Sequence, residues 1–231
     1  MISHKYKCIF IHIPKTAGTS IENKLEHFEH LEYGIQDRKT IRHIEPVSLM
    51  QLLPTNIEKE KKCYDEHYNK LFKKYLKQKL WFYPQYIPNQ QYNKYFEFSF
   101  VLNLWSKVLS WYQNITRDSY QQQNTGELNT CSFKEFVSNH LDRYFLNSQL
   151  SWLLNCENTI PLDFIDRFEN LSDDFAYICD RLEIKDISLP KLLISKQNNG
   201  NYTNFYDSEM KQKVAKKYQE KIDLFKFTFG K

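Results

Sequence analysis

A lysine, a glycine and three hydroxyl side chains stand within seven residues in Pro14-Lys15-Thr16-Ala17-Gly18-Thr19-Ser20. An apolar run ends just before this stretch, and a helical pattern begins within it. The first amides of a helix have no intrahelical acceptor and lie at the positive end of the helix dipole. Such a turn is therefore typical of a site for a phosphate-like anion. Lys15 would add a full positive charge, and Gly18 would let the backbone approach the anion closely.

The order of residues in this loop differs from that of the familiar nucleotide motifs. The Walker pattern GxxxxGK(S/T) is absent, because Lys15 precedes Gly18. The GxGxxG pattern is absent as well, so neither a nucleoside triphosphate with magnesium nor a dinucleotide is favoured. The plainer interpretation is an ordinary strand-to-helix turn with a solvated lysine.

Two elements must position this loop, a buried strand before it and a helix after it. Residues 7–13 are almost continuously apolar, which predicts a strand, and residues 19–31 show helical spacing with Thr19 or Ser20 as the expected cap. The alternation of strands and helices along the chain predicts an α/β fold with a central parallel sheet flanked by helices. Further strands are expected at 96–101 and 160–168, and helices at 45–53, 56–80, 105–112, 132–155, 171–182 and 208–226.

The length of the chain suits one sizeable domain, so residues 1–231 are expected to form a single domain. Residues 55–92 combine a Lys-rich amphipathic pattern with an aromatic, proline-punctuated segment, and they could form a helical insertion that covers the site. The alternative is a solvated helix with no role in ligand binding. Residues 119–130 and 188–206 are polar and are expected to be irregular.

Charge, cysteine content and hydropathy restrict the class of protein. The formal net charge of +4 is too small to indicate nucleic-acid binding, but it suits a small anionic ligand or an acidic polymer. The five cysteines are scattered without a CxxC pair, which argues against a disulfide framework or a structural metal site. No segment reaches the roughly 18 apolar residues of a membrane span, and the first residues lack a signal-peptide core. These features predict a cytoplasmic protein with reduced thiols and no bound metal.

Four segments in order resemble the motifs of one enzyme family. PKTAGTS (14–20) after a strand resembles the 5′-phosphosulfate loop of the carbohydrate sulfotransferases, whose donor is 3′-phosphoadenosine 5′-phosphosulfate. FSFVLNLWSKVLSWY (98–112) is similar to the second motif of that family, and LDFIDRFENLSDDF (162–175) and residues 201–231 are similar to later ones. Residues 55–92 match least. The resemblance implies a P-loop-like sulfotransferase fold and transfer of a sulfuryl group to a hydroxyl of a carbohydrate acceptor.

The resemblance also implies roles for individual residues. Lys15 would contact the sulfate and its bridging oxygen, and the amides and hydroxyls of Thr16–Ser20 would hold the 5′-phosphate. Ser110 would contact the 3′-phosphate, with Asn103 of the same motif beside the donor. His43 would be the base that removes the acceptor proton. The whole loop is therefore expected to line the donor site, namely Pro14, Lys15, Thr16, Ala17, Gly18, Thr19 and Ser20.

Several of the other histidines and charged residues have plainer interpretations. His43 could instead cap a helix or lie at the surface, and Glu22 and Glu45 are alternative bases. His12 alternates within the predicted strand, which indicates a core histidine. Two residues of the third motif could shape the site or form a structural ion pair, Arg167 and Glu169.

The second motif departs from the family pattern at four positions. Leu102 stands where the family has an arginine for the 3′-phosphate, so a planar fork of donors is lost. Such a contact contributes roughly 1.5–3 kcal/mol, and its loss could weaken donor binding about tenfold to a hundredfold unless Lys107, Arg117 or Lys196 compensates. The other three departures are Leu104, Ser106 and Lys107.

Three interpretations follow from the intact loop and the altered second motif. The first is an active sulfotransferase with a changed 3′-phosphate site, which the loop favours. The second is a catalytically impaired protein that binds a glycan or a nucleotide, and the third is a transferase or kinase with another nucleotide. Leu102 favours the second and the third. The sequence predicts neither the identity of the acceptor nor an oligomeric state.

Overall fold

The computed structural model describes residues 2–25, 94–117, 128, 130–155, 158–190 and 201–230. The helices predicted at 45–53 and 56–80 lie outside the described residues, as does the possible insertion at 55–92. Most of the predicted loop at 119–130 lies outside them too.

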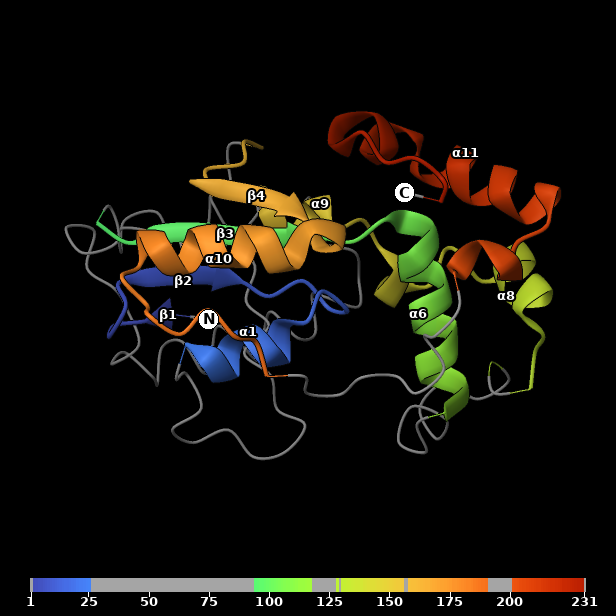
Figure 1. The fold of residues 1–231 in the computed structure, drawn as a ribbon. Helices are drawn as coiled ribbons and strands as arrows, with labels where there is room; N and C mark the ends of the chain where they lie inside the picture. The colour runs from blue at the N-terminus through green and yellow to red at the C-terminus, as the bar shows by residue number, and fades with distance from the viewer. Residues whose placement is uncertain are drawn as a thin grey trace, which may run out of the picture.

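A four-stranded sheet in the order β1-β2-β3-β4 forms the centre of the fold (Figure 1). Strands β2, β3 and β4 are parallel, and Phe10, Phe98 and Phe164 are paired in register across them. This parallel sheet with flanking helices confirms the predicted α/β fold. Strand β1 pairs antiparallel with β2 and was not predicted, because two residues are too few to show an alternating pattern. The strands are Ile2–Ser3, Cys8–Ile11, Phe96–Val101 and Phe164–Arg167.

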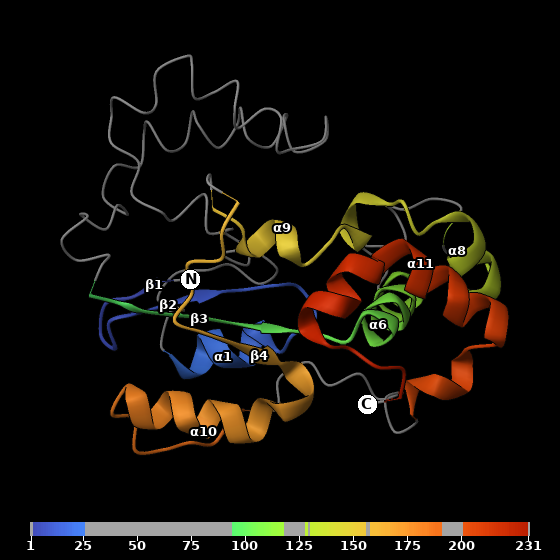
Figure 2. The same ribbon diagram turned by 90° about the horizontal axis from the view of Figure 1, so that it is seen from above.

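One face of the sheet is covered by helices α1 and α10, which lie on the same side of it in Figure 2. Alternate residues of β2 point to this face, and Phe10 stacks on Phe98 with the ring centres 5.1 Å apart. Ile21 of α1 and Phe175 of α10 are fully buried in the same cluster. The alternation in β2 therefore sends Cys8, Phe10 and His12 toward α1. Helix α1 spans Gly18–Lys24, and α10 spans Leu171–Arg181.

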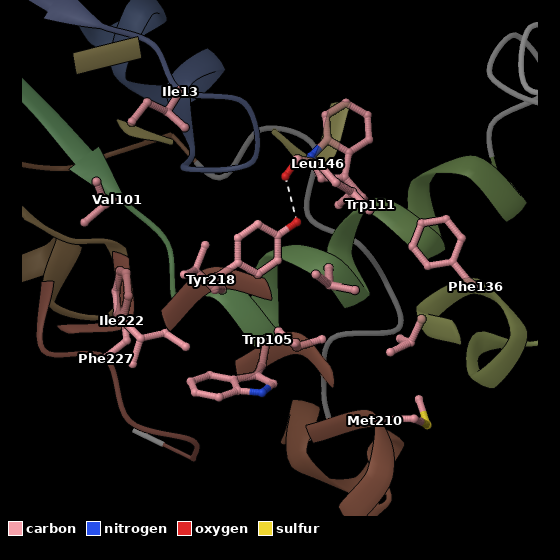
Figure 3. Packing of buried hydrophobic residues seen from close by; sticks show 14 of the residues in the cluster. Ile13, Val101, Trp105, Trp111, Phe136, Leu146, Met210, Tyr218, Ile222 and Phe227 are labelled. Atoms are coloured by element: carbon pink, nitrogen blue, oxygen red, sulfur yellow. Dashed lines mark hydrogen bonds between the residues drawn. The ribbon is translucent and has the colours of Figure 1, made fainter. Parts of the chain in front are cut away.

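The opposite face belongs to a larger, aromatic core. Ile9, Ile11 and Val101 of the sheet pack there against side chains from helices that gather beyond the carboxyl ends of the strands (Figure 1). Tyr218 lies in the middle of this core, and its hydroxyl donates to the Leu146 carbonyl at 2.7 Å (Figure 3). The helices that contribute are α6 (Leu104–Arg117), α8 (Phe133–Asn139), α9 (Leu150–Leu153) and α11 (Ser208–Phe225).

Most helix predictions agree with the structure, and the differences have local causes. Helix α6 continues beyond the predicted end at residue 112, because Ile115 is still buried in the core. In the described part of the segment 188–206, which excludes residues 191–200, a short helical turn at Tyr202–Phe205 departs from the predicted irregular structure. The short 3₁₀ turns are η4 (Tyr144–Leu146), η5 (Phe168–Asn170) and η6 (Tyr202–Phe205).

Two strand-to-helix connections meet at one edge of the sheet. Because β2 and β3 are parallel neighbours, their carboxyl ends lie at the same edge, where ligands of open α/β sheets commonly bind. Residues 12–17 connect β2 to α1, and residues 102–103 connect β3 to α6. We refer to them as the first and the second connection.

Candidate anion-binding site

The first connection has a strained backbone at two positions. Lys15 and Ala17 both have left-handed backbone angles, with φ of 78° and 55°. Each such residue costs on the order of 1–3 kcal/mol, and strain of this kind concentrates at functional sites. The loop is fixed from within, because the buried Thr16 hydroxyl donates to the Ile13 carbonyl at 2.8 Å. Thr16 thus has a hydrogen-bonding role in the loop itself.

The start of α1 differs from the prediction. The cap residue is Ala17, whose carbonyl accepts from the amides of Ser20 and Ile21 at 2.9 and 3.2 Å. The predicted cap at Thr19 or Ser20 is therefore wrong, and both residues lie in the first turn. The left-handed cap tightens the turn and starts the helix earlier than the hydroxyls suggested. Alanine has no side chain to accept from the first amides, so an anion could take that place.

Lys15 reaches from the loop to α6. Its amine donates to the Oδ1 atom of Asn114 at 3.0 Å and lies 5.9 Å from the centre of the Trp111 ring. Ser110 is four residues before Asn114 and therefore shares its side of the helix. Ser110 thus lies one helical turn from the residue that binds Lys15, and the donor-binding roles of Lys15 and Ser110 stay predictions. Asn114 was not predicted, although its spacing from Ser110 was a readable signal.

The structure explains why a glycine stands at position 18, which the sequence did not show. A Cβ atom placed on Gly18 would lie 2.0 Å from the Cδ2 and Nε2 atoms of His12. Real Cβ atoms do not come that close, so glycine is required by the imidazole ring beside it. His12 is 2% exposed, which confirms the interpretation as a core histidine.

The second connection is closed by hydrogen bonds of buried groups. The Leu102 amide donates to Oε1 of Gln149 at 2.7 Å, and Nε2 of Gln149 donates back to the Leu102 carbonyl at 2.6 Å. Leu102 is 4% exposed, and Gln149 is buried as well. Leu102, at the position where the resemblance implies an arginine, is thus held in the interior by hydrogen bonds with Gln149. Gln149 was not identified from the sequence.

Asn103 has protein partners for both ends of its side chain. Its Oδ1 atom accepts from the Trp105 amide at 3.1 Å, which caps α6, and its Nδ2 donates to the Thr228 carbonyl at 2.8 Å. The Asn103 amide donates to Glu169, whose carboxyl pKa is raised by burial. The predicted contact of Asn103 with a donor stays a prediction.

Charged residues near the second connection are also used by the protein. The Lys107 amine donates to the Asn147 carbonyl and is 3% exposed, and burial lowers its pKa to about 7. Arg167 donates to the Lys226 carbonyl at 2.7 Å and lies 5.7 Å from the Phe227 ring centre. Lys107 is therefore held away from solvent, and Arg167 attaches the segment after α11 to the sheet.

The predicted bases fall into two groups. His43 and Glu45 lie outside the described residues, so the role of His43 stays a prediction. Glu22 is fully buried, and its Oε1 lies 2.8 Å from Nδ1 of His12. The Glu22 carboxyl group therefore faces the protein interior and is not placed to act as the base for an acceptor hydroxyl.

The described residues contain a cavity, but no group of metal ligands and no membrane-spanning helix. A hollow of about 570 Å³ lies at the other end of α1, between Lys24 and residues 183–190, and shares no residue with the first connection. Within the described ranges, no three His, Cys, Asp or Glu side chains are grouped as metal ligands. No helix in that part of the chain is both long and apolar enough to cross a membrane.

Comparison with known proteins assigns the family. A sequence model described as the sulfotransferase family matches residues 1–228. The match covers nearly the whole chain, and the chain belongs to the sulfotransferase family. The parallel sheet with flanking helices is consistent with that assignment. No curated protein and no solved structure gave a significant match.

Proposed function

We propose that the chain transfers a sulfuryl group from 3′-phosphoadenosine 5′-phosphosulfate to a hydroxyl of a carbohydrate acceptor. The family assignment supports sulfuryl transfer in general, and the donor and the acceptor are the proposed parts. The observation that carries the proposal is the position of Lys15. Its amine extends from a strained loop at the start of α1 to Asn114 on the Ser110 side of α6.

The residues of the first connection would act by charge and position. During in-line transfer, negative charge develops on the leaving phosphate oxygen, and the Lys15 amine would stabilise it. The first-turn amides of α1, with Thr19 and Ser20, would hold the 5′-phosphate. Holding donor and acceptor together would supply much of the remaining rate acceleration. We keep His43 as the proposed base for the acceptor hydroxyl.

The two ends of the proposed donor fit the site unequally. The 5′ end would meet a cation, hydroxyls and the start of α1, which has no side-chain cap. For the 3′-phosphate, Ser110 offers one hydroxyl, Leu102 offers no donor, and the Lys107 amine is bound to a carbonyl. We therefore propose that the 3′-phosphate is weakly recognised. The affinity for the donor would be about tenfold to a hundredfold lower than at a site with an arginine.

A second candidate function is binding without transfer, to a glycan or a nucleotide. The sealed second connection favours it, because Gln149 occupies both backbone groups of Leu102. A protein with this site could retain the anion loop and still hold a donor too loosely for turnover.

The test is a transfer assay with radiolabelled donor and a panel of uncharged and sulfated glycans. We expect labelled product with at least one glycan and none with the donor alone. Binding of the donor without product from any glycan would favour the second candidate. Product formed equally well from a simple phenol would contradict the carbohydrate acceptor.

The cellular setting belongs to the proposal as well. We propose a reducing, cytoplasmic location, and the free thiols of Cys8, Cys131 and Cys179 support it. The proposed partners are the donor and a hydroxyl-bearing glycan, with no role for nucleic acid.

A further inference from the structure

We propose that His12 and Glu22 form a positioning pair that sets the shape of the first connection and thereby the reach of Lys15. The inference rests on the proposed function only where it concerns the reaction. The shape of the loop can be measured without any nucleotide.

The pair joins the two ends of the loop. His12 directly follows β2, and Glu22 lies within α1, so the 2.8 Å contact between Nδ1 and Oε1 bridges the strand and the helix. Between them lie both left-handed residues, Lys15 and Ala17. Strained backbone persists only where the surrounding structure holds it. The contact is placed to supply that restraint.

The imidazole ring also determines how closely the helix start approaches the strand. It stacks on Phe10, with the ring centres 5.8 Å apart, and it lies against Gly18 on α1. Because Gly18 has no Cβ, the ring can fill the space that a side chain would take. His12 therefore acts as a spacer between the sheet and the first turn of α1.

Glu22 is an unusual residue for a purely structural contact. It is 0% exposed, and its second oxygen, Oε2, has no hydrogen-bond partner among the described residues. A buried carboxyl oxygen without a partner is costly, and apolar residues could fill the same space at lower cost. The Oε1 atom, at 2.8 Å from Nδ1 of His12, is placed to orient the ring.

The test is hydrogen exchange of the amides of residues 15–20 in the full chain, without nucleotide. In Glu22→Ala we expect these amides to exchange about tenfold faster, because the buried hydrogen bond between His12 and Glu22 is lost. Glu22→Gln keeps an oxygen for Nδ1 and should stay close to the wild type. Val214→Ala, which removes buried volume in the other core, is the control for general destabilisation.

The outcomes separate a positioning role from a merely structural one. Unchanged exchange in Glu22→Ala would overturn the proposal, and so would equal acceleration in β3 and α10. Equal effects of the Gln and Ala variants would also overturn it. If Glu22→Ala does not fold, His12→Asn removes the ring and carries the same expectation.

A double-mutant cycle of nucleotide binding tests whether His12 and Glu22 act through Lys15. If His12 acts through Lys15, His12→Asn should weaken binding of adenosine 3′,5′-bisphosphate about tenfold in the wild type and less than about twofold in Lys15→Ala. Equal losses in both backgrounds would contradict action through Lys15. If the wild type binds no nucleotide, the proposed function fails, and the exchange experiment still decides the role of the pair.

Discussion

The two connections at the carboxyl edge of the sheet have the same topology and opposite character. The first has two left-handed residues, a glycine forced by a buried ring, and a lysine that extends toward α6. The second is nearly inaccessible, and its hydrogen bonds are made with Gln149, Glu169 and the Thr228 carbonyl after α11. Equivalent positions in one sheet thus differ, with the second connection closed by packing and the first the one that we propose for a ligand.

The difference also explains how the chain tolerates leucine at position 102. An arginine there would need an anion or an acid as partner, whereas Leu102 needs only burial and a partner for its backbone. Gln149 supplies that partner at 2.6–2.7 Å.

The largest effect is expected from removing the cation of the first connection. Lys15→Ala should lower transfer by at least about a hundredfold, because the amine would stabilise charge in the transition state. Thermal unfolding should change little, since Lys15 is only partly buried. Lys213→Ala, a surface lysine of α11 that pairs with Glu209, is the matched control. Unchanged turnover in Lys15→Ala would show that the first connection is not the reactive one.

A change at the second connection should affect stability and not binding. Gln149→Ala leaves the buried amide and carbonyl of Leu102 without partners, and we expect a loss of about 2–4 kcal/mol in the free energy of unfolding. Denaturant titration measures this loss, with the partly exposed Gln113→Ala as control. Undiminished stability together with lost nucleotide affinity would reverse the assignment of the two connections.

A smaller effect is expected from the pH dependence of Lys107. Burial lowers its folded-state pKa from 10.5 to about 7, so between these values the unfolded state binds a proton that the folded state does not. The free energy of unfolding should therefore rise with pH from 7 to 9, by about 1 kcal/mol per pH unit from this group. Lys107→Met should lose this contribution. A constant difference between the two proteins over this range would contradict the burial of the amine.

Local sequence patterns predicted the three parallel strands, although β4 is shorter than the predicted 160–168. Strand β3 occupies the predicted residues 96–101, where phenylalanines alternate with Glu97 and Ser99 as expected for a strand. The resemblance predicted that Lys15 and Ser110 bind one donor, and this stays a prediction; the fold places Lys15 against Asn114, one turn of α6 from Ser110. The family assignment agrees with the four motifs that carried that resemblance.

What the sequence did not predict depends on contacts between distant segments. Asn114 and Gln149 have ordinary polar side chains, and only the folded chain shows that they meet Lys15 and Leu102. The cap of α1 was mispredicted because Ala17 adopts a left-handed angle that its residue type does not favour. Tertiary restraint, including the His12 ring, outweighs the local preference there.

The most direct test of the account is calorimetric titration with adenosine 3′,5′-bisphosphate and with adenosine 5′-monophosphate. If binding is concentrated at the first connection, the two nucleotides should bind within about tenfold of each other, and Lys15→Ala should weaken both. A preference for the 3′-phosphate of more than about a hundredfold that survives in Lys15→Ala would contradict the account. It would place the principal anion site at the second connection.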